Sequence, residues 1–331
     1  MVRAESKTVD CDYSNFDDYC GHYLEQWEQR ATIRHLKRTR FSAEAAQNEL
    51  FPAGLQILLR HPEVEERGND VRRRILARET ATFMLQVAIL EVDLITKLCI
   101  DFVQMGAGVS VPEAASRVAL TIATDESYHA YVAREYLSDI KLHLDIEPWI
   151  DSSSSLVVAL QELRRAAPVE LERITETMAL CFAENFVTEE LFDLSKQATP
   201  KGPFYTMLRE HMMDEGRHQI FFQRLFRHIW IMLPEERRVA LGRLIPIFLD
   251  GFLGGNNFEA SQIATLEYVG FDSETSKRIA REAISGAFGA EMPKKNRLAF
   301  MKNILNLVDV SGILEHAPTR QLMIDSGWAD V

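Results

Sequence analysis

Two segments of the sequence each place a glutamate three residues before a histidine. The pairs are Glu126 with His129 in ATDESYHAY and Glu215 with His218 in REHMMDEGRHQIFF. Residues three apart share one face of an α-helix, so each pair can present a carboxylate and an imidazole to one point. Together such groups can bind a metal ion. The spacing alone is a weak signal, because 31 glutamates and 9 histidines in 331 residues produce about one such pair by chance.

Two further glutamates stand inside apolar helical runs. They are Glu91 in VAILEVDLI and Glu184 in LCFAENFV. In a helix the neighbours of Glu91 include Val87 and Leu94, and those of Glu184 include Leu180. A buried carboxylate costs several kcal/mol unless it is paired, protonated or bound to a cation. The two glutamates therefore call for a buried partner.

The order of these residues along the chain is nearly a repeat. Glu91 precedes the first Glu-x-x-His pair by 35 residues, and Glu184 precedes the second by 31. One Glu from each of two helices and Glu-x-x-His from each of two others is the ligand set of ferritin-like di-iron carboxylate proteins. Four carboxylates also balance the charge of two divalent ions. Mixed carboxylate and imidazole ligands suit iron or manganese better than calcium, although they do not exclude zinc.

A third histidine falls on the same stripe of the last helix. His211 lies four residues before Glu215 and seven before His218, and as a ligand it would make the two metal sites unequal. Taken singly, each histidine reads more simply as a core or surface residue with a satisfied hydrogen bond. Taken together, the candidate metal ligands are Glu91, Glu126, His129, Glu184, His211, Glu215 and His218.

The remaining polar residues near these motifs have simpler interpretations. Asp125, Asp214 and Glu210 adjoin candidate ligands in the chain and so point off the ligand face, either behind the ligands or toward solvent. His143 and His228 are expected at helix ends or on the surface. We find no catalytic residue beyond the ligands, and no nucleotide-binding glycine motif or Ser/His/Asp set.

Four long helices must position the ligands. The period of apolar residues predicts helices over about 69–105, 113–143, 168–196 and 204–233. Proline and glycine are concentrated at the joints between them, and the serine run 152–155 is expected to be a loop. The predicted fold class is all-α, with a ferritin-like four-helix bundle core over about 69–233.

Shorter helices are expected at both ends of the bundle. A mixed helical pattern begins at Phe16 and ends in a basic segment near residue 38. The C-terminal third, 235–331, suggests helices near 236–252, 258–268, 272–289 and 295–308. No shift in composition marks a second domain, so residues 1–331 are predicted to form one domain whose C-terminal third completes the pocket of the bundle.

Composition and charge narrow the function classes. The 331 residues have a net charge of −12 and are 47% hydrophobic, which is typical of a globular protein and argues against nucleic acid or an anionic membrane as partner. No apolar run is long enough to span a membrane, and the N-terminus lacks the apolar core of a signal peptide. The four cysteines form no CxxC pair. We therefore expect a reduced, cytoplasmic protein.

The seven ligand residues resemble those of the p-aminobenzoate N-oxygenase family of non-haem di-iron enzymes, most clearly over residues 70–230. Every ligand position of the family pattern is filled, and the extra histidine in HxxxExxH distinguishes the family from ferritin-like proteins with two histidines. The resemblance implies two Fe ions as cofactor, O2 as co-substrate, and oxidation of a primary amine to a hydroxylamine or further to a nitroso or nitro compound.

The resemblance also implies partners. Electrons would come from an external reductase or electron-transfer protein, because the sequence has no flavin or nicotinamide motif of its own. The substrate would be an aryl amine or an amino acid, free or bound to a carrier protein, in natural-product biosynthesis, and a homodimer is compatible with this interpretation. Lys294, Lys295, Arg297 and Arg320 are available to bind a substrate carboxylate, although solvated surface charges are the simpler interpretation.

Two alternatives stay open at this point. The ligand set also fits a di-iron hydroxylase or desaturase acting on carbon, which His211 disfavours. A ferritin-like protein that handles iron or peroxide is the other alternative. Such chains are usually about half this length, so the C-terminal third favours an enzyme with a substrate pocket.

Overall fold

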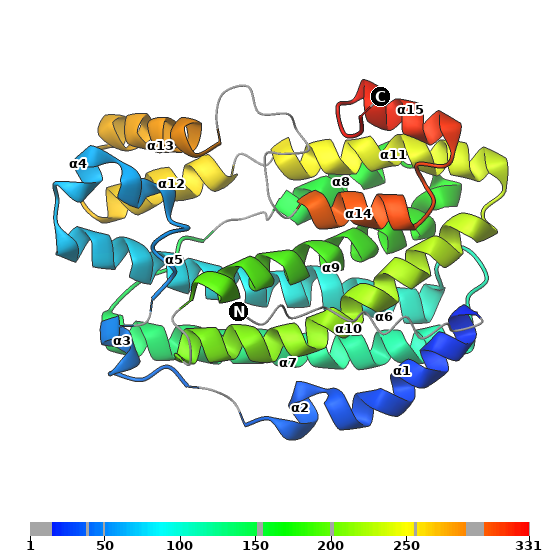
Figure 1. Ribbon diagram of the computed structural model, residues 1–331, viewed down its shortest axis with the longest axis horizontal. Coiled ribbons are helices and arrows are strands. Elements are labelled where there is room, and N and C mark those ends of the chain that lie inside the picture. The colour runs from blue at the N-terminus through cyan, green and yellow to red at the C-terminus, as the bar shows by residue number, and fades with distance from the viewer. Residues whose placement is uncertain are drawn as a thin grey trace, which may run out of the picture.

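The computed structural model describes residues 15–37, 40–48, 50–150, 155–198, 202–254, 257–288 and 301–330. Every regular element in these ranges is a helix, which confirms the predicted all-α class (Figure 1). No helix within the same ranges is long and apolar enough to cross a membrane.

Four long helical segments form the bundle core (Figure 1). The first is continuous and consists of α5 (Asn69–Leu90), the π-helical segment η2 (Glu91–Thr96) and α6 (Lys97–Met105). The others are α7 (Glu113–Leu144), α9 (Glu172–Gln197) and α10 (Pro203–Met232). Helix α5 packs on α7, and α9 packs on α10. The four predicted helices are confirmed, with boundaries within a few residues of those expected.

The bundle helices begin and end where the sequence supplies a physical reason. Helix α6 ends at Gly106, whose φ of 74° favours glycine. Helix α7 follows Pro112 and ends at Asp145, which adopts the left-handed conformation of a C-terminal cap. Pro203 occupies the first turn of α10, where its missing N–H costs no hydrogen bond.

One helix of the middle region was not expected. Residues 152–154 of the serine run lie outside the described ranges, but Ser155 begins α8 (Ser155–Ala166), so the loop expected over 152–155 is wrong at its last residue. Helix α8 precedes the short 3-10 segment η3 (Val169–Leu171). Helix α8 packs against α11 (Glu235–Gly254) and α9. The run LVVALQELRR has helical apolar spacing. The serines before it were interpreted as a loop, so the start of the helix was not recognised.

Shorter helices flank the bundle on both sides. On the N-terminal side, α1 (Phe16–Arg30) packs on α7 and α10, and α2 (Thr32–His35) also contacts both helices (Figure 1). Along the chain, α2 is followed by α3 (Ala45–Asn48), η1 (Ile57–Arg60) and α4 (Pro62–Glu65), which precede the first bundle helix.

The C-terminal third follows the predicted order in part. It contains α11, α12 (Asn257–Tyr268), α13 (Ser273–Phe288), α14 (Met301–Val310) and α15 (Ala317–Asp325). Helices α11 to α13 confirm three expected helices, whereas α15 was not predicted. The start of the helix expected over 295–308 lies outside the described residues, and α14 covers its second half.

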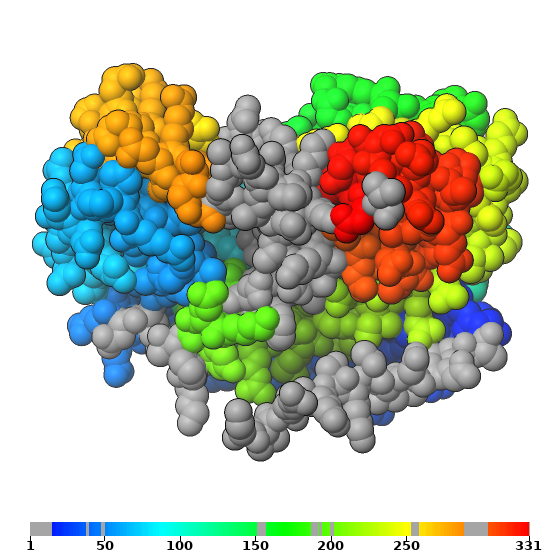
Figure 2. Space-filling view, turned by 45° about the horizontal axis from the view of Figure 1, so that its top comes forward, coloured from blue at the N-terminus to red at the C-terminus, as the bar shows by residue number. Residues whose placement is uncertain are grey.

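Buried apolar residues form two clusters. The large one fills the bundle and extends to α8, α11, α14 and α15. The smaller one joins η1, α4 and the start of α5 to α12 and α13, around residues such as Leu58, Ile75, Leu266 and Ile279. Figure 2 shows the two flanking groups at opposite ends of the molecule, α13 beside α4 and α5, and α15 beside α14.

Candidate metal centre

The seven predicted ligands meet in one buried cluster inside the bundle. Each of the four long segments contributes: η2 gives Glu91, α9 gives Glu184, and α7 and α10 give the rest. The glutamates and His218 have no exposed surface, and His129 and His211 are 4% and 5% exposed. In a metal-free chain, this concentration of buried ionisable groups is costly.

The cluster divides into two overlapping groups, in each of which one ligand atom per residue lies within 4.8 Å of all the others. Glu126 and Glu215 belong to both groups. The first group adds Glu91, His129 and His211, and the second adds Glu184 and His218. Two neighbouring cation sites that share two carboxylates would satisfy this arrangement, and the first would have the extra histidine.

A local departure from α-helical geometry lies at Glu91. The π-helical segment begins at this residue and ends at Thr96. Single π turns inside long α-helices recur at functional sites, where the extra residue in the turn shifts the side chains on either side. Glu91 and Leu94 are buried here while Val92 stays half exposed.

The side chains in the cluster approach one another closely. Nδ1 of His129 lies within hydrogen-bond distance of Oε2 of Glu126, at 3.2 Å, but several other facing atoms form no hydrogen bond. Nε2 of His211 lies 3.1 Å from Oε1 of Glu215 and 3.3 Å from Oε1 of Glu91. Nδ1 of His218 lies 2.6 Å from Oε1 of Glu126. None of these atoms, nor the second carboxylate oxygens of Glu91 and Glu215, has a hydrogen-bond partner among the described residues. Their lone pairs converge on shared points, which is the arrangement that a cation requires.

The pKa values of the buried glutamates in the metal-free cluster are shifted in opposite directions. Burial raises the pKa of Glu91 and of Glu184 well above the ordinary value, and nearby carboxylates raise both further. Burial also opposes ionisation of Glu126, but the charges of His218 and His129 outweigh it and lower the pKa of Glu126 to about 2. Two divalent cations would allow all four carboxylates to ionise.

Two aspartates lie directly behind the imidazoles in a crossed arrangement. Nε2 of His129 on α7 lies 3.1 Å from Asp214 on α10, and Nε2 of His218 on α10 lies 3.2 Å from Asp125 on α7. Each contact leaves Nδ1 of the histidine facing the cluster. The sequence predicted these aspartates either behind the ligands or in solvent. Asp125 and Asp214 lie behind the ligands, and both side chains are fully buried. Carboxylates in this place orient metal-binding imidazoles.

The N-terminal helices hold the two aspartates. The indole Nε1 of Trp27 donates to both oxygens of Asp125 at 3.1 and 3.0 Å. The backbone N–H and the hydroxyl of Thr32 donate to Asp214, as does Arg217 at 2.5 Å. Burial opposes ionisation of Asp214, but its hydrogen bond with His129 prevails and lowers its pKa.

Sequence reasoning did not find the residues that support the aspartates. Arg217 stands between two ligands in the chain, which was a usable signal. Trp27 and Thr32 gave none, because they precede the bundle and approach it only in the folded chain.

A small, partly open pocket of about 20 Å³ reaches the cluster on the side of the extra histidine. It lies between α2, α7 and α10, and is lined by Thr32, Leu36, Tyr128, His129, Val132, Met207, Glu210 and His211. Glu210 was expected either behind the ligands or in solvent. It is half-buried and lines the opening to the cluster. The pocket reaches His129 and His211 with room for about one molecule of the size of water.

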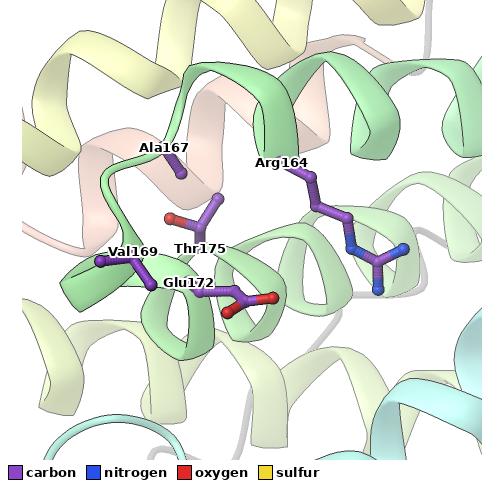
Figure 3. A pocket seen from close by; sticks show the side chains of 5 residues that line it. All are labelled: Arg164, Ala167, Val169, Glu172 and Thr175. Atoms are coloured by element: carbon purple, nitrogen blue, oxygen red, sulfur yellow. The ribbon is translucent and has the colours of Figure 1, made fainter.

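A second cavity, of about 230 Å³, lies at the turn between α8 and α9 (Figure 3). Its lining consists of Arg164, Ala167, Val169, Glu172 and Thr175, none of which belongs to the cluster. Arg320, one of the four expected substrate-binding cations, is exposed on α15 and lines neither cavity. Lys294, Lys295 and Arg297 lie outside the described residues.

The two other histidines named in the sequence lie outside the cluster, as expected. His228 bonds the carbonyl of Ser110 through Nε2 at 3.0 Å. His143 is exposed near the end of α7, beside the ring of Phe41.

The chain matches a known family. The model for P-aminobenzoate N-oxygenase AurF covers residues 37–286. All seven cluster residues and both aspartates fall inside this interval, whereas Trp27 and Thr32 precede it. No curated protein matches the chain.

Proposed function

The chain belongs to the AurF p-aminobenzoate N-oxygenase family, and on that premise we propose that it uses two iron ions and O2 to oxidise the nitrogen of a primary amine. The observation that carries the proposal is the set of buried carboxylate and imidazole atoms that converge in two overlapping groups, each within 4.8 Å. Glutamate and histidine together are ligands suited to iron.

The proposed ligand assignment follows the two groups. Glu91, His129 and His211 would hold one iron, and Glu184 and His218 the other. Glu126 and Glu215 belong to both groups and could therefore contribute to holding both irons. The second group would offer fewer protein ligands than the first.

The chain's own residues prepare the site in three ways. Asp125 and Asp214 fix the histidine rings, so that Nδ1 of each faces inward. The apolar bundle keeps bulk water from the cluster. A small pocket reaches His129 and His211 from outside the bundle. When bound, the iron pair supplies the electrons and open coordination positions with which O2 is activated.

The substrate and the electron source are proposed from the family. The amine would be an aryl amine or an amino acid, either free or attached to a carrier protein, and the product a hydroxylamine, nitroso or nitro compound. Electrons would come from an external donor. The first ligand group includes His211. Because di-iron hydroxylases and desaturases that act on carbon use a ligand set with two histidines, this third histidine favours amine oxidation.

The test is to load the protein with iron, reduce it, and expose it to O2 with panels of amines. We expect close to two irons per chain, and mass spectrometry should find oxygen on the amine nitrogen. A Glu126→Gln variant, which lacks one shared carboxylate, should lose both iron and product. A Glu172→Gln variant, altered at the second cavity, should retain both.

Two results would contradict the proposal. Full amine oxidation by metal-free protein would remove the need for the cluster. Oxidation of carbon with no amine oxidised would favour a hydroxylase or desaturase.

A further inference from the structure

We propose that the corner formed by α1 and α2 is the docking surface for an acidic electron-transfer protein, and that electrons reach the metal centre from it through Trp27, Asp125 and His218. This inference rests on the proposed function, because it concerns how electrons reach the same centre.

The burial of the cluster creates the need for such a route. Glu91, Glu126, Glu184, Glu215 and His218 have no exposed surface, so a protein donor cannot touch the ions they would hold. Electrons must then cross a layer of protein. Electron tunnelling slows steeply with distance, and covalent and hydrogen bonds carry it better than gaps between atoms do.

A short hydrogen-bonded path crosses this layer. Nδ1 of His218 faces the cluster, and its Nε2 lies 3.2 Å from Oδ2 of Asp125. The same oxygen accepts from Nε1 of Trp27 at 3.0 Å. Trp27 is only partly buried on α1, so two hydrogen bonds join a candidate ligand to an aromatic ring that solvent can reach.

The matching path on the other half of the site ends differently. His129 contacts Asp214, which is held by Thr32 and Arg217. A hydroxyl and a guanidinium have no aromatic π system. Of the two crossed aspartates, Asp125 is therefore the one that connects the cluster to a good electron relay.

The surface around Trp27 has the charge to attract an acidic partner. The described residues of 30–40 include four Arg or Lys and no acid, in a chain whose net charge is −12. One of the four, Arg40, pairs with Asp139 on α7 at 2.9 Å. Arg34 and Lys37 are exposed, and the Arg34 guanidinium lies 5.9 Å from the Trp27 ring centroid. The ion pair between Arg34 and Glu28 is exposed and contributes little to stability, so Arg34 can pair with an acidic group of a partner instead. Charge of this kind steers association with a partner of opposite sign.

Apolar groups complete the surface. Ile33 and Leu36 are each 37% exposed, beside the basic residues, and Met213 on α10 is 51% exposed. Helix α2 packs on α10. A few apolar contacts inside a charged rim are typical of small, transient interfaces between electron-transfer proteins.

The electron balance needs only a one-electron donor. Each transfer would oxidise one reduced iron–sulfur cluster of the donor and reduce one ferric ion to ferrous. Two transfers reduce the pair. No covalent bond forms or breaks in either transfer.

The test measures the reduction of the centre, apart from amine oxidation. Iron-loaded, oxidised protein would be mixed anaerobically with a reduced acidic [2Fe–2S] ferredoxin as the probe, whose low potential makes it a strong donor. Stopped-flow absorbance then gives the rate at which the ferredoxin is oxidised. Reduced methyl viologen, a small cation, serves as a donor that needs no basic docking surface.

Two variants probe the two halves of the proposal. Arg34→Glu with Lys37→Glu should slow reduction by ferredoxin about tenfold or more and leave reduction by methyl viologen unimpaired. Trp27→Phe should slow reduction by ferredoxin several-fold. The matched controls are Arg237→Glu, an exposed charge on α11, and Trp149→Phe, a tryptophan outside the path. Both should keep the wild-type rate.

Binding and folding are measured separately. Titration of the iron-loaded protein with oxidised ferredoxin should show affinity that falls with salt and is lost in the double charge reversal. Iron content and thermal midpoint show whether Trp27→Phe still holds the site. Should that variant fail to load iron, Trp27→Tyr, which keeps a polar aromatic ring, takes its place and should also slow reduction.

The outcomes separate this inference from the proposed function. Unchanged ferredoxin oxidation in the charge-reversed variant or in the Trp27 variants would overturn the inference. So would a wild-type protein that is reduced by methyl viologen but not by ferredoxin. A wild-type protein that binds no iron, or oxidises no amine with either donor, contradicts the proposed function instead.

Discussion

Glu126 and Glu215 occupy a different place in the cluster from His211. Both glutamates belong to the two ligand groups, whereas His211 belongs to one. Removal of a shared carboxylate takes a ligand from both ions. Removal of His211 takes one from a single ion and leaves the second group intact.

This difference gives a prediction for metal content. Glu215→Gln should lower bound iron the more, because both groups lose a ligand, while His211→Ala should weaken iron binding at one site only, since the first group keeps four of its five residues. Elemental analysis after dialysis measures both. His228→Gln, at a histidine outside the cluster, should keep two irons. Equal losses in the Glu215 and His211 variants would contradict the assignment of shared and unshared ligands.

The ligands were predictable from sequence because their chemistry is local. A Glu-x-x-His pair is visible within four residues, and a glutamate in an apolar run is visible within eight. Trp27 and Asp125, by contrast, lie 98 residues apart in the chain, and Thr32 and Asp214 lie 182 apart. Nothing in the residue types near Trp27 predicts a contact that arises only when α1 packs on α7.

Helix α5 is the element that joins the two apolar clusters. Its first turns contribute Ile75 and Leu76 to the smaller cluster, and its later turns contribute Phe83 and Met84 to the larger one. Glu79 lies at the junction, where Gln56 donates to its carboxylate at 3.0 Å. Burial raises the pKa of Glu79 to about 7, although this hydrogen bond and Arg78 oppose the shift.

A pH-dependent stability change follows for Glu79→Gln. The raised pKa means that folding favours the protonated acid, so wild-type stability falls as the pH rises from the unfolded value near 4.5 to about 7. The variant should be more stable by about 1–2 kcal/mol at pH 8, an amount discounted because Glu79 is partly exposed. At pH 4 the two proteins should be similar.

Urea unfolding at both pH values measures this difference. Glu66→Gln, on the exposed surface near α4, is the control and should behave alike at the two pH values. If the Glu79→Gln variant were no more stable than wild type at pH 8, the ionised Glu79 carboxylate would not destabilise the folded protein.

Helix predictions succeeded where the apolar period was long and breakers marked the ends. The π-helical segment could not be predicted, since Glu91–Thr96 differs from its neighbours in hydrogen-bond register and not in residue type. Helix α8 was missed because polar serines precede it. Helix α15 is short, and its fold depends on packing against α11.

At the scale of the whole molecule, the metal centre lies inside the larger cluster, and α12 and α13 pack mainly in the smaller one. The sequence predicts a single domain over residues 1–331. If the chain unfolds as one unit, a ligand that binds only the folded state stabilises every part of it equally.

Hydrogen exchange tests this prediction. Iron loading should slow the exchange of the most protected amides in α12 and α13 as well as in α7, α9 and α10. The metal-deficient Glu215→Gln variant should show no such slowing in any of these helices. Slowing confined to the bundle would show instead that α12 and α13 form a separate folding unit.

The hydrogen bonds from α1 and α2 to the two aspartates also bear on protein engineering. A minimal bundle cut from this chain at residue 37 would contain every candidate metal ligand and both aspartates. It would lack Trp27 and Thr32, and so the donors that hold those aspartates against the imidazoles. Such a scaffold would reproduce the composition of the site without its rigidity, and its metals would exchange faster than those of the full chain.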